Sequence, residues 1–189
     1  GKQGLALGPG IGNHSGTTEL VEKLVHICEL PMIIDADGLN HIAKNPDMLK
    51  RKKASIILTP HPGEMARLCK LSTKEIQADR IGTARQFAAE FQVILILKGA
   101  GTVIALPDGT TFISSTGNAG MASGGMGDVL TGMIAGFCAQ GLSPEKASIA
   151  GVYLHGLCAD ILAERIGSFG YLASDLVRII PESQNRIFG

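Results

Sequence analysis

STGNAGMASGGMGDVLTGMIAGF, residues 115–137, places a cluster of glycines directly before an apolar pattern of helical spacing. Glycine is favoured where φ is positive or where the backbone approaches a ligand closely. The first N–H groups of a helix have no partner inside it and lie at its positive dipole end, so the stretch predicts a backbone site for an anion such as phosphate. The glycines are Gly117, Gly120, Gly124, Gly125 and Gly127, and the apolar residues are Val129, Leu130, Met133, Ile134 and Phe137.

Asp128 follows this glycine cluster and has two interpretations. It is either a first-turn acid that favours a helix N-terminus, or a base that takes a proton from a hydroxyl as that oxygen attacks or leaves a phosphoryl group. An isolated Gly-Asp pair favours the cap. The glycine density favours the base, because a cap alone needs no flexible approach path.

Composition excludes several classes of partner. The chain has 189 residues and a formal net charge of +0, which suits one domain and argues against nucleic-acid or anionic-membrane partners. No apolar run reaches the roughly 18 residues of a membrane span, and no signal-peptide pattern is present, so we expect a cytoplasmic protein. The four cysteines show no metal-binding spacing and are expected to be buried thiols: Cys28, Cys69, Cys138 and Cys158.

Short apolar runs alternate with helical patterns, beginning with a βα unit of residues 4–7, the loop GPGIG and a helix over 17–29. Such runs predict an α/β fold with a mainly parallel sheet covered on both faces. Ligands bind beyond the carboxyl ends of strands in these sheets. The further predicted strands are 32–34, 55–58 and 93–97, and they run into DADGLN, TPHPGE and KGAGT.

Each polar residue at these strand ends also has a purely structural interpretation. Asp35 could orient a loop through backbone N–H groups, and Asp37 is expected to cap a short helix over 40–43. His61, fixed between two prolines, suits a side chain that must be aimed, although a lone turn histidine is more often a satisfied polar group. Glu64 could start a helix or hold another loop. Lys98 could pair with a phosphate or with an acid from another strand.

The remaining segments read as supporting structure. Ser72 and Glu75 form a capping box for one long helix whose core face includes Ile81. The turn Pro107-Asp108-Gly109 predicts an antiparallel edge hairpin over 102–106 and 110–113. Ser143-Pro144 starts another helix, in which His155 is structural. Ser174-Asp175 is expected to cap a last helix through Ile179 that ends near Pro181.

KGAGT, NAGMASGGMGDVLTGMIAG, DADGLN and TPHPGEMARL together resemble the ADP/ATP-dependent NAD(P)H-hydrate dehydratase family, in one order along nearly the whole chain. The resemblance implies a ribokinase-like three-layer αβα fold. It also implies repair of hydrated NADH and NADPH: ADP or ATP, with Mg²⁺, phosphorylates the ring hydroxyl, and phosphate then leaves. Another implied feature is a single domain over 1–189 that lacks the family's N-terminal portion. Losing that portion would expose a sheet edge or an apolar helix face, so we expect a homo-oligomer, with a tetramer as one candidate state.

The resemblance also assigns roles to individual residues. Gly10, His61 and Asp128 would lie against the hydrate, with Asp128 as the base. The adenine nucleotide would contact Lys98, Gly99, Ala100, Gly101, Thr102 and Gly127, while the magnesium ligands stay unknown. Two alternatives remain: a ribokinase-like kinase for a vitamin precursor or sugar, and a catalytically silent nucleotide-binding module.

Overall fold

The computed structural model describes residues 1–188 and shows six strands in one sheet whose spatial order follows the chain, β1-β2-β3-β4-β5-β6. The first four strands are parallel. The last two form an antiparallel hairpin that continues the sheet from β4. The predicted mixed sheet with its edge hairpin is therefore confirmed. The strands are β1 Leu5–Leu7, β2 Met32–Ile34, β3 Ile56–Leu58, β4 Ile94–Leu97, β5 Val103–Ala105 and β6 Thr111–Ile113.

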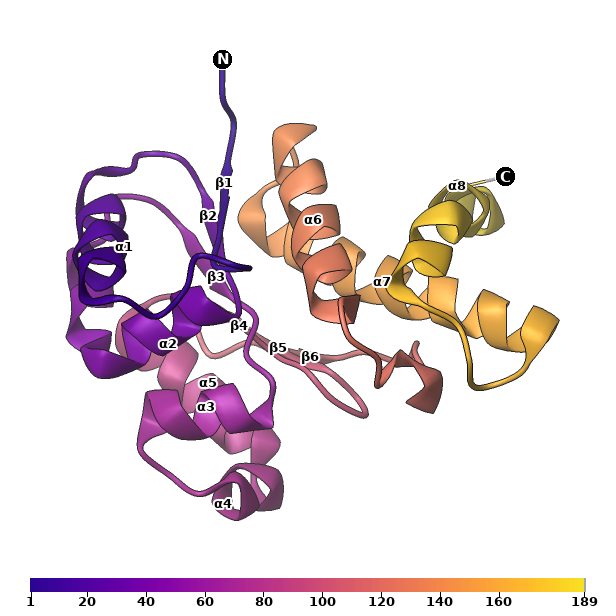
Figure 1. The fold of residues 1–189 in the computed structure, drawn as a ribbon, viewed down its shortest axis with the longest axis horizontal. Helices are drawn as coiled ribbons and strands as arrows, with labels where there is room; N and C mark the ends of the chain where they lie inside the picture. Colours follow the sequence, from indigo (N-terminus) through magenta and orange to yellow (C-terminus); the bar gives the residue numbers. More distant parts are fainter. Residues whose placement is uncertain (189) are drawn as a thin grey trace.

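Helices cover both faces of this sheet (Figure 1). The crossovers between the parallel strands run on one face, and the helices after the hairpin cover the other, which gives three layers. The crossover elements are α1 Ser15–Ile27, α2 Asp37–Lys44, the 3₁₀ segment η1 Pro46–Arg51, α3 Pro62–Cys69, α4 Thr73–Ala78 and α5 Arg80–Phe91. The later elements are the 3₁₀ turn η2 Ala119–Met121, α6 Met126–Ala139, α7 Pro144–Ile166 and α8 Ala173–Phe188.

The strand pleat divides the apolar core between the two faces. In β2, Met32 and Ile34 pack with the crossover helices, whereas Ile33 packs with α6 and α7. Alternate side chains of a strand point to opposite faces, so continuous apolar runs are expected of strands buried on both sides. The face toward α6 and α7 carries mainly isoleucines, namely Ile33, Ile57, Ile94, Ile96 and Ile104.

The long helix expected after Ser72 is two helices. The predicted capping box is present, with Glu75 N–H donating to Ser72 Oγ, but α4 ends at Ala78. Asp79 then caps α5 by accepting from Gly82 N–H at 2.8 Å. An Asp is a strong N-cap and starts the new helix here. The break turns Ile81 outward, so this predicted core residue is 42% exposed.

The last helix also differs from its prediction, because α8 continues through Pro181 to Phe188. A proline inside a helix removes the hydrogen bond to the carbonyl four residues earlier, here that of Val177. Both Pro181 and Val177 are exposed, so water can solvate the freed carbonyl. Asp175 lies inside the first turn and accepts from Leu172 N–H.

The predicted start of the helix that follows α6 is confirmed. Ser143 caps α7 and Pro144 is its first residue. Of the four cysteines predicted to be buried thiols, Cys138 and Cys158 are buried free thiols, whereas Cys28 and Cys69 are only half-buried. Among the described residues, no helix is long and apolar enough to cross a membrane.

Candidate functional site

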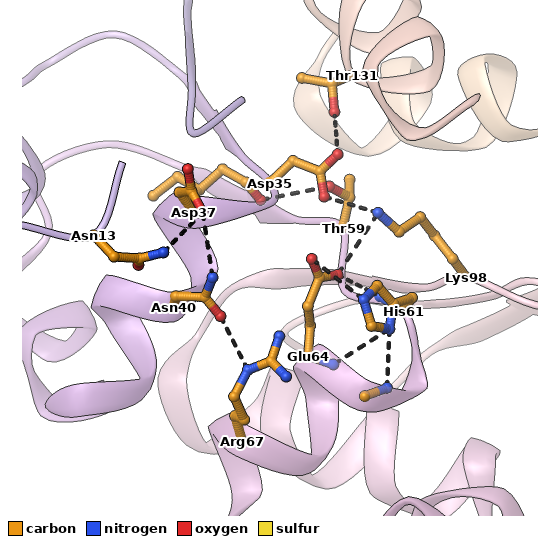
Figure 2. Close-up of polar contacts among 12 residues, drawn as sticks. Asn13, Asp35, Asp37, Asn40, Thr59, His61, Glu64, Arg67, Lys98 and Thr131 are labelled. Carbon is orange, nitrogen blue, oxygen red and sulfur yellow. Dashed lines mark hydrogen bonds and ion pairs between the residues drawn. The ribbon is translucent and has the colours of Figure 1, made fainter. Parts of the chain in front are cut away.

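A buried ion pair joins the carboxyl ends of two strands. Lys98, directly after β4, donates from Nζ to Asp35 Oδ1 at 2.8 Å, and Asp35 directly follows β2. Thr131 Oγ1 on α6 donates to the second oxygen, Asp35 Oδ2, at 3.1 Å (Figure 2). Asp35 is 1% exposed. Of the two partners considered for Lys98, the structure shows an acid from another strand, and Asp35 acts through its side chain on Lys98 and Thr131 rather than on a loop's backbone.

A second carboxylate, that of Glu64, faces the same ammonium. Glu64 Oε2 lies 3.8 Å from Lys98 Nζ and accepts from His61 N–H at 2.8 Å. In return, His61 Nδ1 accepts from Gly63 N–H at 3.0 Å and from Glu64 N–H at 3.4 Å, which completes a capping box on α3. The ring proton therefore lies on Nε2, which is 3.6 Å from Glu64 Oε1. His61 is thus aimed by its own helix and connected to Lys98 through Glu64.

The N-terminus of α6 meets this charge cluster at Gly127. A Cβ placed on Gly127 would lie 3.1 Å from Lys98 Nζ and 3.2 Å from Asp35 Oδ2. Gly125, the N-cap, has a φ of 85° in the left-handed region. The glycine loop therefore opens a helix at the sheet's carboxyl edge, as predicted. Asp128, the next residue, lies exposed in the first turn of α6.

The GPGIG loop is held from both sides at Gly12. Asp37 Oδ2 accepts from Gly12 N–H at 3.0 Å, and His41 Nε2 lies 2.8 Å from Gly12 O. The expectation that Asp37 caps a helix is wrong. It is the first residue of α2, and it turns its carboxylate to this loop because β1 and β2 are adjacent and parallel. Gly10, the predicted substrate contact, has φ 73°, and a Cβ placed on it would meet nothing within 4 Å.

The KGAGT segment leaves β4 at the same edge of the sheet. Lys98 N–H donates to Pro60 O at 2.8 Å, and Thr102 Oγ1 donates to Gly99 O at 3.1 Å. Gly99 and Gly101 have φ values of 148° and 62°, which residues with side chains rarely adopt. The tight loop exposes the backbone of residues 99–101.

The glycine loop itself is anchored to α7 and to the segment between α7 and α8. Asp160 on α7 accepts from Gly117 N–H and from Asn118 Nδ2, each at 2.9 Å. Asn118 Oδ1 in turn accepts from Tyr171 OH and from Gly120 N–H. Under this loop His155 is buried, as expected of a structural residue, and burial lowers its pKa to about 4.

The structure thus brings most of the sequence-predicted residues to one edge of the sheet. Lys98 and Gly127 are in contact distance, and His61 reaches them through Glu64. Gly10, residues 99–102 and Asp128 lie on the loops and the helix end of the same edge. Sequence reasoning did not predict that Asp35 pairs with Lys98 or that Thr131 donates a hydrogen bond to Asp35. The only signal for Thr131 was a hydroxyl group in an apolar helix, one turn after Asp128.

These groups suit a polyanionic ligand better than a tightly held metal. Within residues 1–188, no group of three or more His, Cys, Asp or Glu is placed to hold a metal ion. Mg²⁺ commonly binds proteins through one or two carboxylates together with substrate phosphates and water. Phosphates are commonly bound by groups of this kind, namely an ammonium, a glycine-rich helix N-terminus and exposed loop amides.

A separate hollow of about 630 Å³ lies at the amino ends of β3 and β4. It is lined by residues including Glu29, Lys52, Gln92 and Glu145, whose charges are mixed, and none of the predicted site residues lines it. The loops that carry the predicted site residues lie at the opposite edge of the sheet, beyond the carboxyl ends of the strands.

Comparison with known proteins finds relatives that match nearly the whole chain. A bifunctional NAD(P)H-hydrate repair enzyme from Moorella thermoacetica is 46% identical over 177 residues, which are 94% of this chain and 33% of that protein. The ADP/ATP-dependent NAD(P)H-hydrate dehydratase of Bacillus subtilis, co-crystallised with ATP and Mg²⁺, superposes with a TM-score of 0.87 at 36% identity, covering 97% of this chain and 64% of that one. A ribokinase-like superfamily protein from Enterococcus faecalis superposes with a TM-score of 0.80 at 28% identity, covering 97% and 63% of the two chains.

The expected ribokinase-like fold is therefore confirmed, and the chain spans between a third and two thirds of the length of these relatives. The family model for NAD(P)H-hydrate dehydratase matches residues 2–182. This match covers nearly the whole chain, and the chain therefore belongs to the NAD(P)H-hydrate dehydratase family.

Proposed function

We propose that this protein dehydrates hydrated NADH and NADPH back to NADH and NADPH at the expense of ADP or ATP. The observation that carries the proposal is the meeting of Gly127 with the Asp35–Lys98 pair. It places a helix N-terminus, an ammonium and the KGAGT loop at one edge of the sheet. The Bacillus subtilis relative is named for this nucleotide-dependent dehydration, which supports the same reaction here.

In the proposed reaction the hydroxyl oxygen of the hydrated nicotinamide ring attacks the terminal phosphorus of the nucleotide. An oxygen–phosphorus bond forms, the bridging phosphorus–oxygen bond breaks, and the hydroxyl proton passes to the Asp128 carboxylate. The ring carbon–oxygen bond then breaks, inorganic phosphate leaves, and a proton lost from the adjacent ring carbon restores the double bond. Phosphate is a far better leaving group than hydroxide, which explains why a dehydration would consume a nucleotide.

The chain's own residues would bind and orient the reactants. We propose that residues 98–102 and Gly127 contact the nucleotide, and that Gly10, His61 and Asp128 lie against the hydrate. The first turn of α6 would stabilise charge developing on the transferred phosphoryl group. Because Asp35 and Glu64 fix the Lys98 ammonium, that positive charge stays in place without reorganisation during the reaction.

Mg²⁺ would arrive with the nucleotide and neutralise its phosphate charge. We propose that Asp35 and Glu64 would help to hold the ion beside the nucleotide phosphates. Both carboxylates face the same ammonium at this edge, so they fit such a role without forming a cage. We further propose that the enzyme works in the cytoplasm as a homo-oligomer.

The test is the recovery of the reduced-nicotinamide absorbance when the protein is incubated with NADPH hydrate, Mg²⁺ and ADP or ATP. We expect the chromophore to return only when protein and nucleotide are both present, with one inorganic phosphate released per chromophore. A ribokinase-like kinase would consume nucleotide and accumulate a phosphorylated product without the chromophore. A silent module would bind nucleotide in calorimetry without turnover, and either result would overturn the proposal.

A further inference from the structure

Arg80 stands at a position where a cation is unfavourable for its own helix. It is the first residue of α5, where the positive end of the helix dipole favours acidic side chains. No carboxylate oxygen lies within ion-pair distance of Arg80 anywhere in the described part of the chain. The residue is half-buried, and this burial lowers the pKa of its guanidinium. Its placement therefore needs a reason outside α5.

The guanidinium lies against the backbone of the KGAGT loop. Nη2 donates to Leu97 O at 3.1 Å and to Gly101 O at 3.4 Å, and Nη1 donates to Lys98 O at 3.5 Å. Nη1 also donates to Gln77 Oε1 at 3.2 Å. Arginine suits this contact because its planar fork offers several donors in fixed directions, which lysine cannot match.

This contact also explains Gly99. A Cβ on Gly99 would lie 2.5 Å from Arg80 Nη1 and 3.0 Å from Nη2, so any side chain there would displace the guanidinium. The guanidinium therefore occupies the space beside Gly99, 19 residues away in sequence, and a side chain at Gly99, whose φ of 148° already favours glycine, would push it off the loop.

The direction of the carbonyls determines what the loop offers to a ligand. In a trans peptide the C=O and the following N–H point in opposite directions. Because Lys98 O and Gly101 O point to Arg80, the N–H groups of Gly99 and Thr102 point away from it. Among residues 1–188 neither N–H donates a hydrogen bond, so both are open to an acceptor outside the chain.

We propose that Arg80 is a positioning residue of the nucleotide site: it gathers the carbonyls of the KGAGT loop on one side so that the amides of Gly99 and Thr102 face the nucleotide on the other. The inference rests on the proposed function for the identity of the ligand. Its geometric part, that Arg80 holds the loop in one conformation, can be measured without any ligand.

The experiment compares Arg80→Ala, Arg80→Lys and the control Arg85→Ala, which removes an exposed arginine from the same helix. Calorimetry with ADP and with ATP gives the dissociation constant, and steady-state kinetics give KM for each substrate. We expect Arg80→Ala to raise the nucleotide dissociation constant and KM at least about tenfold, with KM for the hydrate unchanged. Arg80→Lys should fall between, and Arg85→Ala should match the unsubstituted protein.

Backbone NMR order parameters separate this inference from the proposed function. In Arg80→Ala we expect the values for Gly99 and Gly101 to fall from about 0.85 to below about 0.6, while those of β4 stay unchanged. Unchanged order parameters would overturn the inference, whether or not the protein binds nucleotide. A failure of the unsubstituted protein to bind ADP or ATP would instead remove the proposed function. If Arg80→Ala fails to fold, Arg80→Lys carries the same measurements. Unchanged nucleotide affinity beside a mobile loop would also overturn it.

Discussion

Lys98 Nζ lies 2.8 Å from Asp35 Oδ1, and this pair joins two strand ends that are 63 residues apart in the chain. Asp35 is almost fully buried, and the Lys98 ammonium lies beside its carboxylate. Removing one member of a buried pair leaves an uncompensated charge, which typically costs about 3–5 kcal/mol.

We therefore predict that Lys98→Met lowers the free energy of unfolding by about 3–5 kcal/mol, as well as weakening nucleotide binding. Urea denaturation measures the stability effect. Adding Asp35→Asn to Lys98→Met should restore part of the loss, because the second change removes the unpaired charge. Lys50→Met removes an exposed partner of Asp47 and should leave the urea midpoint almost unchanged. Equal effects of the two lysine substitutions would contradict the prediction.

Gly127→Ala should damage the site although alanine normally favours a helix. The added methyl would lie 3.1 Å from Lys98 Nζ, so we expect the ammonium to shift and turnover to fall at least about tenfold. The matched control is Gly132→Ala on the same helix, where the added methyl meets nothing within 4 Å. This control should keep full activity and stabilise the protein by about 0.5–1 kcal/mol. Equal activity of the two variants would show that close approach at Gly127 does not matter.

Asp128→Asn tests the proposed base. We expect turnover to fall by about 10²–10⁴-fold, because the amide cannot accept the hydroxyl proton, while calorimetry should show nearly unchanged ADP and ATP affinity. Asp108→Asn makes the same change at the exposed hairpin turn and should leave turnover unaltered. Retained activity in Asp128→Asn would remove its role as base.

His155 should make stability depend on pH. Its pKa is lowered from 6.5 to about 4 by burial, with the nearby Lys98 charge adding to this effect, so the unfolded chain takes up the proton first as pH falls. The free energy of unfolding should therefore decrease by up to about 1.4 kcal/mol per pH unit from pH 6.5 down toward 4, relative to a variant without the group. Denaturation of His155→Gln beside the unsubstituted protein measures the difference. Parallel pH profiles of the two proteins would contradict this assignment.

The strands and their polar ends could be predicted from the sequence because both signals are local. Runs such as Ile94–Leu97 are continuous and apolar, and the residues after them are polar or glycine. The α4–α5 break could also have been found, since Asp79 is a good N-cap, but the apolar periodicity continued across it.

The partners within the site could not be predicted in the same way. Nothing in the spacing of Asp35 and Lys98 indicates contact, because they follow β2 and β4, and the distance between these strands depends on how the four parallel strands are ordered. Asp37 was predicted to be a cap because acidic residues at the start of a helix often are caps. In the structure its carboxylate accepts a hydrogen bond from Gly12 N–H in the neighbouring loop instead. Arg80 belongs to no recognisable sequence motif. Its contact with the KGAGT loop is visible only in the hydrogen bonds that it donates to the carbonyls of Leu97 and Gly101.

The isoleucine face of the sheet has a consequence for synthesis of the protein. The crossover helices can cover their face as each strand leaves the ribosome, but Ile33, Ile57 and Ile94 are covered only by α6 and α7, which are translated after the last strand. A nascent chain that stalls before residue 126 would carry a sheet with one apolar face exposed to water. Such intermediates aggregate readily, so chaperone demand during translation should peak just before α6 emerges.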